Sequence, residues 1–125
     1  MKPYLCGPIN GCSDEEATGW RTRAKALFPD ALDPMRRDFR GQEAANVSEI
    51  VEGDKHDIDG CDALLVWHER PSVGTAMEVL YAWERGKRVV VIDRSGWPLS
   101  PWLVYHAHAV TTSLELAAVA LGVVS

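Results

Sequence analysis

The sequence predicts a three-layer α/β fold, in which a five-stranded parallel sheet of strand order 2-1-3-4-5 carries helices on both faces. Short apolar runs alternate with amphipathic segments along the chain. The runs ALLVW (63–67) and VVVI (89–92) are apolar throughout, which is typical of strands covered on both sides. Because parallel strands are joined by right-handed crossovers, the intervening helices cover both faces of the sheet. We therefore expect a flavodoxin/Rossmann-like arrangement.

The first strand and the first helix are predicted from the N-terminal segment. Tyr4-Leu5 forms the strand, and a Gly/Pro/Asn loop, GPINGCS (7–13), follows it. Ser13 and Glu16 have the spacing of a capping box, and the apolar residues after them recur on one helical face. This pattern predicts a helix over 14–28.

A short second strand is expected at 31–32, and a polar loop over 33–42 leads into a second helix over 43–60. The apolar residues of this helix fall on one face, which should be buried against the sheet. They are Val47, Ile50, Val51, Ile58 and Cys61.

The C-terminal half continues the alternation. A third helix is predicted over 75–85, and Gly86 follows it in the position of a left-handed C-cap. After VVVI, a Trp/Pro-rich segment (95–102) precedes a weak strand at 109–111 and a last helix over 113–121.

The strand order also predicts where a ligand binds. In the order 2-1-3-4-5 the chain reverses direction between strands 1 and 3, and ligands bind between the loops that follow those two strands. These loops are GPINGCS (7–13) and HERPSVG (68–74). The predicted fold alone therefore makes these two loops the candidate ligand-binding site.

Size and composition indicate a single domain over residues 1–125, because 125 residues at 46% hydrophobic content bury one continuous core. Three cysteines, Cys6, Cys12 and Cys61, show no metal-binding or disulfide spacing, which favours a reducing compartment. The apolar runs are too short for a signal peptide or a membrane span. We expect a cytoplasmic protein without membrane association.

The net charge of −5 argues against binding to a nucleic acid polymer, which requires clustered Lys and Arg. A small phosphorylated ligand is compatible with it. The one basic cluster, Arg36, Arg37 and Arg40 in DPMRRDFRG, fits a phosphate site and a solvated loop equally well.

Two carboxylates of the second helix are out of place. Asp54 lies one turn after Ile50 and one before Ile58, on the stripe that should face the sheet, and Asp57 shares that side. Burying a carboxylate costs several kcal/mol unless it is paired, and the C-terminal end of a helix disfavours negative charge. The two residues are candidate functional groups, or else a carboxylate bonded to an arginine or to backbone N–H groups that anchors the helix.

Glu78 falls in the opening turn of the third helix, where the helix dipole stabilises an ionised carboxylate. Such a group can act as a nucleophile. Thr75-Ala-Met-Glu78 also has the spacing of a capping box, a device for starting helices that carries no chemistry. Periodicity alone does not separate these two interpretations.

Three segments together resemble the nucleoside 2-deoxyribosyltransferase family and the related nucleoside 5'-monophosphate N-glycosidases. They are YLCGPINGC (4–12), DKHDIDGCDALLVW (54–67) and PSVGTAMEVLYAWERGKRVVVI (71–92). The most specific element is the Gly-x-x-x-Glu-x-x-x-Ala register of Gly74, Glu78 and Ala82, which follows a strand and precedes Gly-Lys and another strand.

The resemblance implies roles for individual residues. The nucleophilic glutamate of the family falls on Glu78, and its aspartate falls on Asp54 when Asp62 is taken as the residue that heads the third strand. The first-strand loop lines the sugar and base pocket in the family. The candidate substrate-binding residues are Tyr4, Gly7, Pro8, Ile9, Ser72 and Gly74, and Asp57 is added as a neighbour of Asp54 without a secure counterpart in the best-known members of the family.

The resemblance also implies a reaction. Glu78 would displace the base from C1' and form a ribosyl ester, and water or another base would then take the sugar with net retention. Asp54 would orient the nucleophile or relay a proton to the base. No metal or organic cofactor is expected, and the sequence offers no His/Cys cluster for one.

The turn before Glu78 bears on the substrate. Transferases that act on free nucleosides usually have an acidic residue there, whereas the N-glycosidases have a Pro-Ser turn whose serine binds the 5'-phosphate. Pro71-Ser72 matches the second pattern, and a serine at a helix N-terminus attracts phosphate. Glu69 nearby acts against this inference, and Ser72 can also be an ordinary helix cap.

Two further expectations concern the whole molecule. Five tryptophans, including Trp83, Trp97 and Trp102, are many for a small domain and favour a homodimer or a higher homo-oligomer, as in related enzymes. The alternative to an enzyme is a non-catalytic nucleotide-binding module on the same fold, in which Glu78 only caps a helix.

Overall fold

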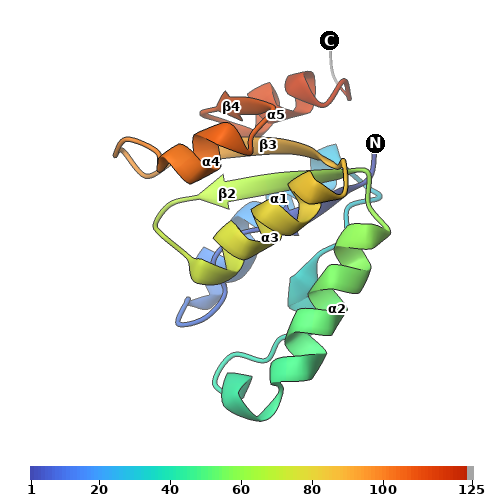
Figure 1. Cartoon of the computed structure of the whole chain (residues 1–125), viewed down its shortest axis with the longest axis vertical. Helices are drawn as coiled ribbons and strands as arrows, with labels where there is room; N and C mark the ends of the chain where they lie inside the picture. Colours follow the sequence, from blue (N-terminus) through green and yellow to red (C-terminus); the bar gives the residue numbers. More distant parts are fainter. Residues whose placement is uncertain (124–125) are drawn as a thin grey trace.

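The computed structural model describes residues 1–123, and its centre is one parallel sheet (Figure 1). Four strands form the sheet in the order β1-β2-β3-β4: β1 Pro3–Cys6, β2 Ala63–His68, β3 Arg88–Asp93 and β4 Ala109–Thr111. In the register of the sheet, Leu5 pairs with Leu65 and Leu65 with Val90. The parallel sheet predicted from the apolar runs is confirmed.

The prediction of five strands in the order 2-1-3-4-5 was wrong. The segment 31–32 lies beside β1 as expected, but it makes a single bridge, between Leu32 and Tyr4. Leu32 N donates to Pro3 O at 2.9 Å and Leu5 N donates to Leu32 O at 3.0 Å. The pairing ends there because Pro34 has no N–H and starts a 3₁₀ turn, capped by the Asp33 side chain.

Helices cover both faces of the sheet. They are a π-helical turn Glu15–Gly19 that runs into α1 Trp20–Leu27, then α2 Val47–Asp59, α3 Val73–Glu84, α4 Pro101–Tyr105 and α5 Leu114–Ala120. Side chains of α1 and α5 pack on one face of the sheet, and those of α2, α3 and α4 on the other. Figure 1 shows α3 in front of the sheet and α1 behind it. The three-layer arrangement is therefore confirmed.

The second helix differs from its prediction. A separate 3₁₀ turn spans Glu43–Ala45, and α2 begins only at Val47. Val47 and Val51, predicted to be buried, are 60% and 45% exposed. The reason is that the N-terminal half of α2 extends beyond the sheet (Figure 1), so only its C-terminal half, with Ile58, packs on a strand.

The short helix α4 was missed by the periodicity. Its signal was present, because the Ser100 side chain accepts a hydrogen bond from Trp102 N and Pro101 occupies the first helical turn. Gly86, in contrast, has the predicted left-handed conformation, with φ of 73°.

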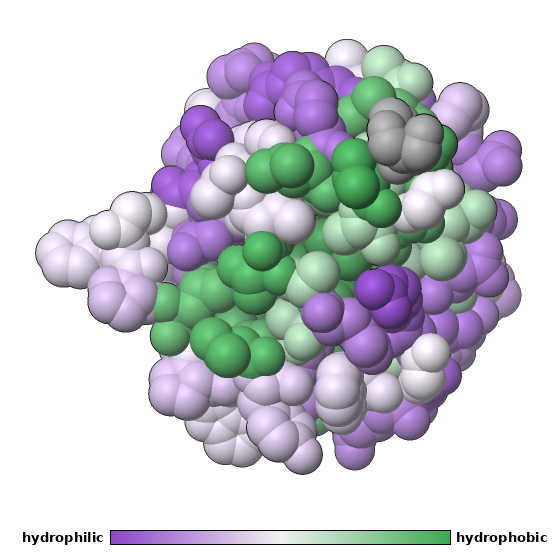
Figure 2. Space-filling view, turned by 90° about the horizontal axis from the view of Figure 1, so that it is seen from above, coloured by the Kyte–Doolittle hydropathy of each residue, from purple (hydrophilic) through white to green (hydrophobic). Residues whose placement is uncertain are grey.

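Apolar side chains gather on the outer face of β4 and α5. Figure 2, which looks onto this end of the molecule, shows hydrophobic residues across it. The exposed apolar residues here are Val110 of β4, Leu116 and Val119 of α5, and Val123, which follows the end of α5 by three residues. On the neighbouring segment, Trp97 and Trp102 are 78% and 70% exposed. Among residues 1–123, no helix has both the length and the apolar character needed to cross a membrane.

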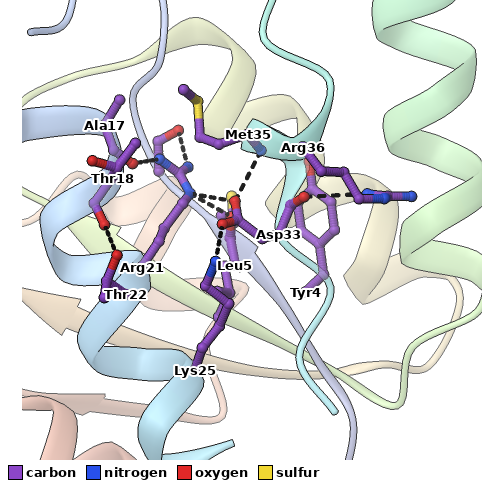
Figure 3. Close-up of polar contacts among 12 residues, drawn as sticks. Tyr4, Leu5, Ala17, Thr18, Arg21, Thr22, Lys25, Asp33, Met35 and Arg36 are labelled. Atoms are coloured by element: carbon purple, nitrogen blue, oxygen red, sulfur yellow. Dashed lines mark hydrogen bonds and ion pairs between the residues drawn. The ribbon is translucent and has the colours of Figure 1, made fainter. Parts of the chain in front are cut away.

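The most deeply buried charge of the fold belongs to Arg21 of α1, which is 0% exposed (Figure 3). Its guanidinium donates to three carbonyl oxygens, of Leu5 at 3.2 Å, Gly7 at 3.0 Å and Ala17 at 2.5 Å. Asp33 lies 3.8 Å from its Nε and also binds Lys25 at 2.9 Å. Arg21 therefore joins the end of β1, the π-helical turn and the segment after Leu32.

We predict that Arg21→Met destabilises the protein by about 3 kcal/mol, because it leaves buried carbonyl oxygens and Asp33 without their partner. Urea unfolding followed by circular dichroism measures the change. Arg23→Met is the matched control, since Arg23 lies on the exposed side of the same helix and should change stability by less than about 0.5 kcal/mol. Equal losses for the two variants would contradict the assigned role.

Candidate active site

A cavity of about 360 Å³ opens at the carboxyl ends of β1 and β2. Its walls include the two loops expected from the fold, through residues 7–10 and 70–74. The segment 34–43 and helix α2 add Pro34, Arg37, Phe39, Arg40, Glu43, Ile50 and Asp54, and α3 adds Thr75 and Glu78. Parallel α/β sheets bind ligands at this edge, so the cavity is the candidate active site.

Glu78 lies at the inner end of this cavity, with both carboxylate oxygens hydrogen bonded to β1. Tyr4 Oη donates to Oε2 at 2.8 Å, and Cys6 Sγ donates to Oε1 at 3.3 Å. Tyr4 and Cys6 are two residues apart on one strand, so their side chains point to the same face of the sheet. Two donors on β1, the Tyr4 hydroxyl and the Cys6 thiol, therefore fix the orientation of the Glu78 carboxylate.

The capping-box interpretation of Glu78 was wrong. Helix α3 begins at Val73 rather than at 75, and its N-cap is Ser72, whose Oγ accepts from Thr75 N at 3.4 Å. Glu78 therefore lies beyond the first turn, and its oxygens contact Tyr4 and Cys6 instead of the helix start. The stabilisation of its charge by the helix N-terminus, expected from the sequence, falls away with distance.

The surroundings of Glu78 favour its neutral form. Burial, and next the negative charge of Asp54, raise the pKa of Glu78 to about 8, while the Tyr4 and Cys6 hydrogen bonds act in the opposite direction. Burial and the nearby Glu78 raise the pKa of Tyr4 far above its ordinary value, so its hydroxyl keeps the proton that it donates. Glu78 is thus a carboxyl group that changes charge close to neutral pH.

Asp54 lines the cavity beside Glu78, and its side chain is 19% exposed. Arg37 reaches it from the segment between α1 and α2, with Nη2 3.4 Å from Asp54 Oδ1. The same Nη2 donates to Asp57 Oδ2. Gly53 leaves room for this arginine, because a Cβ there would lie 2.4 Å from Arg37 Nη1.

Asp57 does not line the cavity, although the sequence made it a candidate for substrate binding. Arg36 binds it through two hydrogen bonds of 2.7 Å each, and Arg37 binds it as well. Burial acts to raise the pKa of Asp57, but the two arginines hold it below its ordinary value. Asp57 thus anchors the arginine segment to α2, which is the structural alternative considered for these carboxylates.

Two further arginines line the rim of the cavity. Arg40 donates to Asp14 and Asp38 and to Cys12 O. Arg70, on the other side, lies 2.8 Å from Cys12 Sγ and 3.5 Å from Glu16. Ser72 and Gly74 lie between Arg70 and Glu78 in the chain, at the N-terminus of α3, and line the same cavity.

The predicted residues of the first loop are also part of this wall. Gly7, Pro8 and Ile9 line the cavity, whereas Tyr4 contributes from beneath through its bond to Glu78. Gly7 is needed for close packing, since a Cβ there would lie 3.0 Å from the Trp20 ring.

A second cavity, of about 810 Å³, adjoins the first and shares the wall formed by Arg70, Pro71, Ser72, Val73 and Thr75. His68 and Glu69 line this second cavity, and Glu69 accepts a hydrogen bond from Trp67 Nε1. Within residues 1–123, no group of three or more His, Cys, Asp or Glu side chains is arranged to hold a metal ion.

Cys6 was missed in the sequence as part of the site, and Arg37 was named only within a basic cluster that fits a phosphate site or a solvated loop. Cys6 was detectable, because a period of two along β1 puts it on the same face as Tyr4. The contact of Arg37 with Asp54 had no local signal, since it joins residues 17 positions apart.

Comparison with known proteins identifies the family. The sequence profile of the nucleoside 2-deoxyribosyltransferase family matches residues 3–108. Among solved structures, the 2-deoxyribosyltransferase of the psychrotolerant bacterium Bacillus psychrosaccharolyticus has a similar fold, with a TM-score of 0.76 at 17% identity over 94% of this chain and 90% of that chain. No curated protein sequence matches significantly. Since the profile spans both loops and every residue of the cavity, the chain belongs to the nucleoside 2-deoxyribosyltransferase family.

Proposed function

We propose that the protein cleaves the N-glycosidic bond of a (deoxy)nucleoside 5'-monophosphate or nucleoside through a covalent ester with Glu78, and passes the sugar to another base or to water. The observation that carries the proposal is the Glu78 carboxyl group at the inner end of the cavity, held by Tyr4 at 2.8 Å and Cys6 at 3.3 Å, with Asp54 beside it. A fixed carboxylate next to a second carboxyl group is the arrangement that a retaining double displacement requires.

In the first step a carboxylate oxygen of Glu78 bonds to C1' while the bond from C1' to the base nitrogen breaks and its electron pair leaves with the base. The base takes up a proton, for which Asp54 is the nearest candidate relay. In the second step the nitrogen of another base, or water, attacks C1' on the same face and loses its proton. Glu78 is released as a carboxylate, so the anomeric configuration is retained.

Arg37 acts through Asp54 in this proposal. Its Nη2 lies 3.4 Å from Asp54 Oδ1, and Asp57, itself bound by Arg36, holds the arginine in place. A positive charge at this point keeps Asp54 oriented toward the reacting groups. Arg37 is therefore a positioning residue.

Several contacts support a 5'-monophosphate as the substrate. Ser72 caps α3 at the cavity wall, where the first N–H groups of the helix and Arg70 provide positive potential. The charge of Glu69 acts against phosphate binding in the sequence analysis. In the structure Glu69 lines the second cavity and accepts a hydrogen bond from Trp67 Nε1. The 360 Å³ volume matches a small ligand rather than a polymer.

Self-association is part of the proposal. The exposed apolar residues of β4 and α5 and the exposed Trp97 and Trp102 support a homodimer or a higher homo-oligomer. Trp83, in contrast, packs against residues of its own chain: the centroid of its ring lies 4.9 Å from that of His108 and 5.5 Å from that of His106.

We predict that Glu78→Gln lowers the rate of base release by on the order of 10³-fold or more, because an amide cannot form the ester. In the parent protein kcat/KM should rise with pH up to about 8, since Glu78 is protonated and inactive below its pKa. Chromatography of free base measures both effects. Glu84→Gln, at the exposed end of the same helix, is the control and should leave the rate unchanged. Ligand binding without base release by the parent would favour the non-catalytic module instead.

Arg37→Gln should lower kcat by about 10- to 100-fold with little change in KM, because a displaced Asp54 is poorly aligned for the reaction. Gly53→Ala should produce the same loss, since its Cβ would meet Arg37 Nη1 at 2.4 Å and push the guanidinium away. Arg88→Gln is the control, because Arg88 is exposed at the start of β3 and does not line the cavity. Full activity in both Arg37→Gln and Gly53→Ala would refute the positioning role.

A panel of deoxynucleosides and their 5'-monophosphates, each with and without a second base, tests the substrate and the acceptor. We expect base release or exchange from the monophosphates, and Ser72→Asp should raise their KM at least about tenfold by repelling the phosphate while retaining the helix cap. Exchange from free nucleosides alone would overturn the assignment of Ser72 to phosphate. Release without a second base indicates hydrolysis, and release that requires the base indicates transfer.

A further inference from the structure

We propose that Cys6 is a positioning residue for Glu78, whose thiol fixes the second oxygen of the carboxylate and so orients it for attack on C1'. The inference rests on the proposed role of Glu78 as nucleophile. It assigns a function to a buried thiol that neither the sequence pattern nor the family resemblance singled out.

The geometry of the thiol supports this role. Cys6 is the last residue of β1 and is fully buried, with Sγ 3.3 Å from Glu78 Oε1 and 3.9 Å from Thr75 O. A thiol has one proton to donate, and the shorter contact is to the stronger acceptor, the carboxylate. Burial raises the pKa of Cys6 well above its ordinary value, so the group remains a donor.

Two donors are needed to fix the carboxylate. The hydroxyl of Tyr4 holds only Oε2 of Glu78, and this single contact leaves the carboxylate group free to rotate about that oxygen. The thiol contacts the other oxygen, Oε1, and both contacts originate from one short strand. Because β1 is paired with β2 along its length, the two donors keep a fixed spacing and define the plane of the carboxylate.

Packing alone does not account for the choice of residue. Cys61 is a second buried thiol in the same apolar cluster, but it precedes β2 and so lies at the opposite end of the sheet from the cavity. The two cysteines share their burial and their chemistry and differ in their distance from Glu78. Cys61→Ala is therefore the matched control for Cys6→Ala.

The test compares the pH profiles of kcat/KM for base release from nucleoside 5'-monophosphates in Cys6→Ala, Cys6→Ser and Cys61→Ala. Cys6→Ala should lower kcat about 3- to 10-fold. It should also move the acidic limb of the kcat/KM profile to higher pH by about half a unit, because the removed thiol is a donor that favours the ionised carboxylate of Glu78. Cys6→Ser keeps a donor and should recover most of the loss. Cys61→Ala should leave kcat and the limb unchanged.

Two results would overturn the inference: an unshifted limb in Cys6→Ala, or equal losses in Cys6→Ala and Cys61→Ala at matched thermal stability. The ionisation of Glu78 can also be followed directly by ¹³C NMR of the labelled carboxyl group, with Glu78→Gln to assign the signal. A higher pKa in Cys6→Ala than in the parent supports the contact even when no substrate is turned over. If the protein releases no base but Cys6→Ala still raises the pKa of Glu78, the proposed function is rejected and the role of Cys6 in holding Glu78 is not.

Discussion

The buried guanidinium of Arg21 is the interaction on which the site most depends. A charge without solvent contact needs compensation, and here it comes from three carbonyl oxygens, of Leu5, Gly7 and Ala17, and from the carboxylate of Asp33. Burial lowers the pKa of Arg21, and Asp33 opposes that shift. Because the carbonyls of Leu5 and Gly7 belong to β1 and to the loop after it, one side chain fixes both the strand that holds Glu78 and the first wall of the cavity.

A row of alternating charges extends from the outside of α2 toward Glu78. It runs from Arg36 to Asp57, on to Arg37 and then to Asp54, and each neighbouring pair is in contact. Glu78 lies at the end of this row, where burial and next the negative charge of Asp54 raise its pKa to about 8. A carboxyl group with a perturbed pKa in a cavity is a candidate functional group, which is consistent with the proposed role of Glu78.

Local patterns were sufficient for most of the sheet and for part of the site. The bounds of β4 agree with the prediction at 109–111, those of β2 and β3 agree within one residue, and Asp54, a candidate from its helical position, lines the cavity. The exposure of Val51 could not be predicted locally, because it depends on the extent of the sheet, which distant parts of the chain determine. The choice between two possible helix starts did have a local signal, since Ser72 was itself a possible cap, and the structure places the N-cap there.

The division of the cavity between strands and loops has an evolutionary consequence. Tyr4, Cys6 and the cavity residue Glu78 belong to the hydrophobic core and its bordering helix, where substitutions disturb packing. The opposite wall, with Phe39 and Glu43, belongs to an irregular segment that tolerates change. Mutation can therefore change which ligand is accepted while the proposed reactive group is inherited unaltered, so that one ancestral chemistry can serve descendants with different preferences.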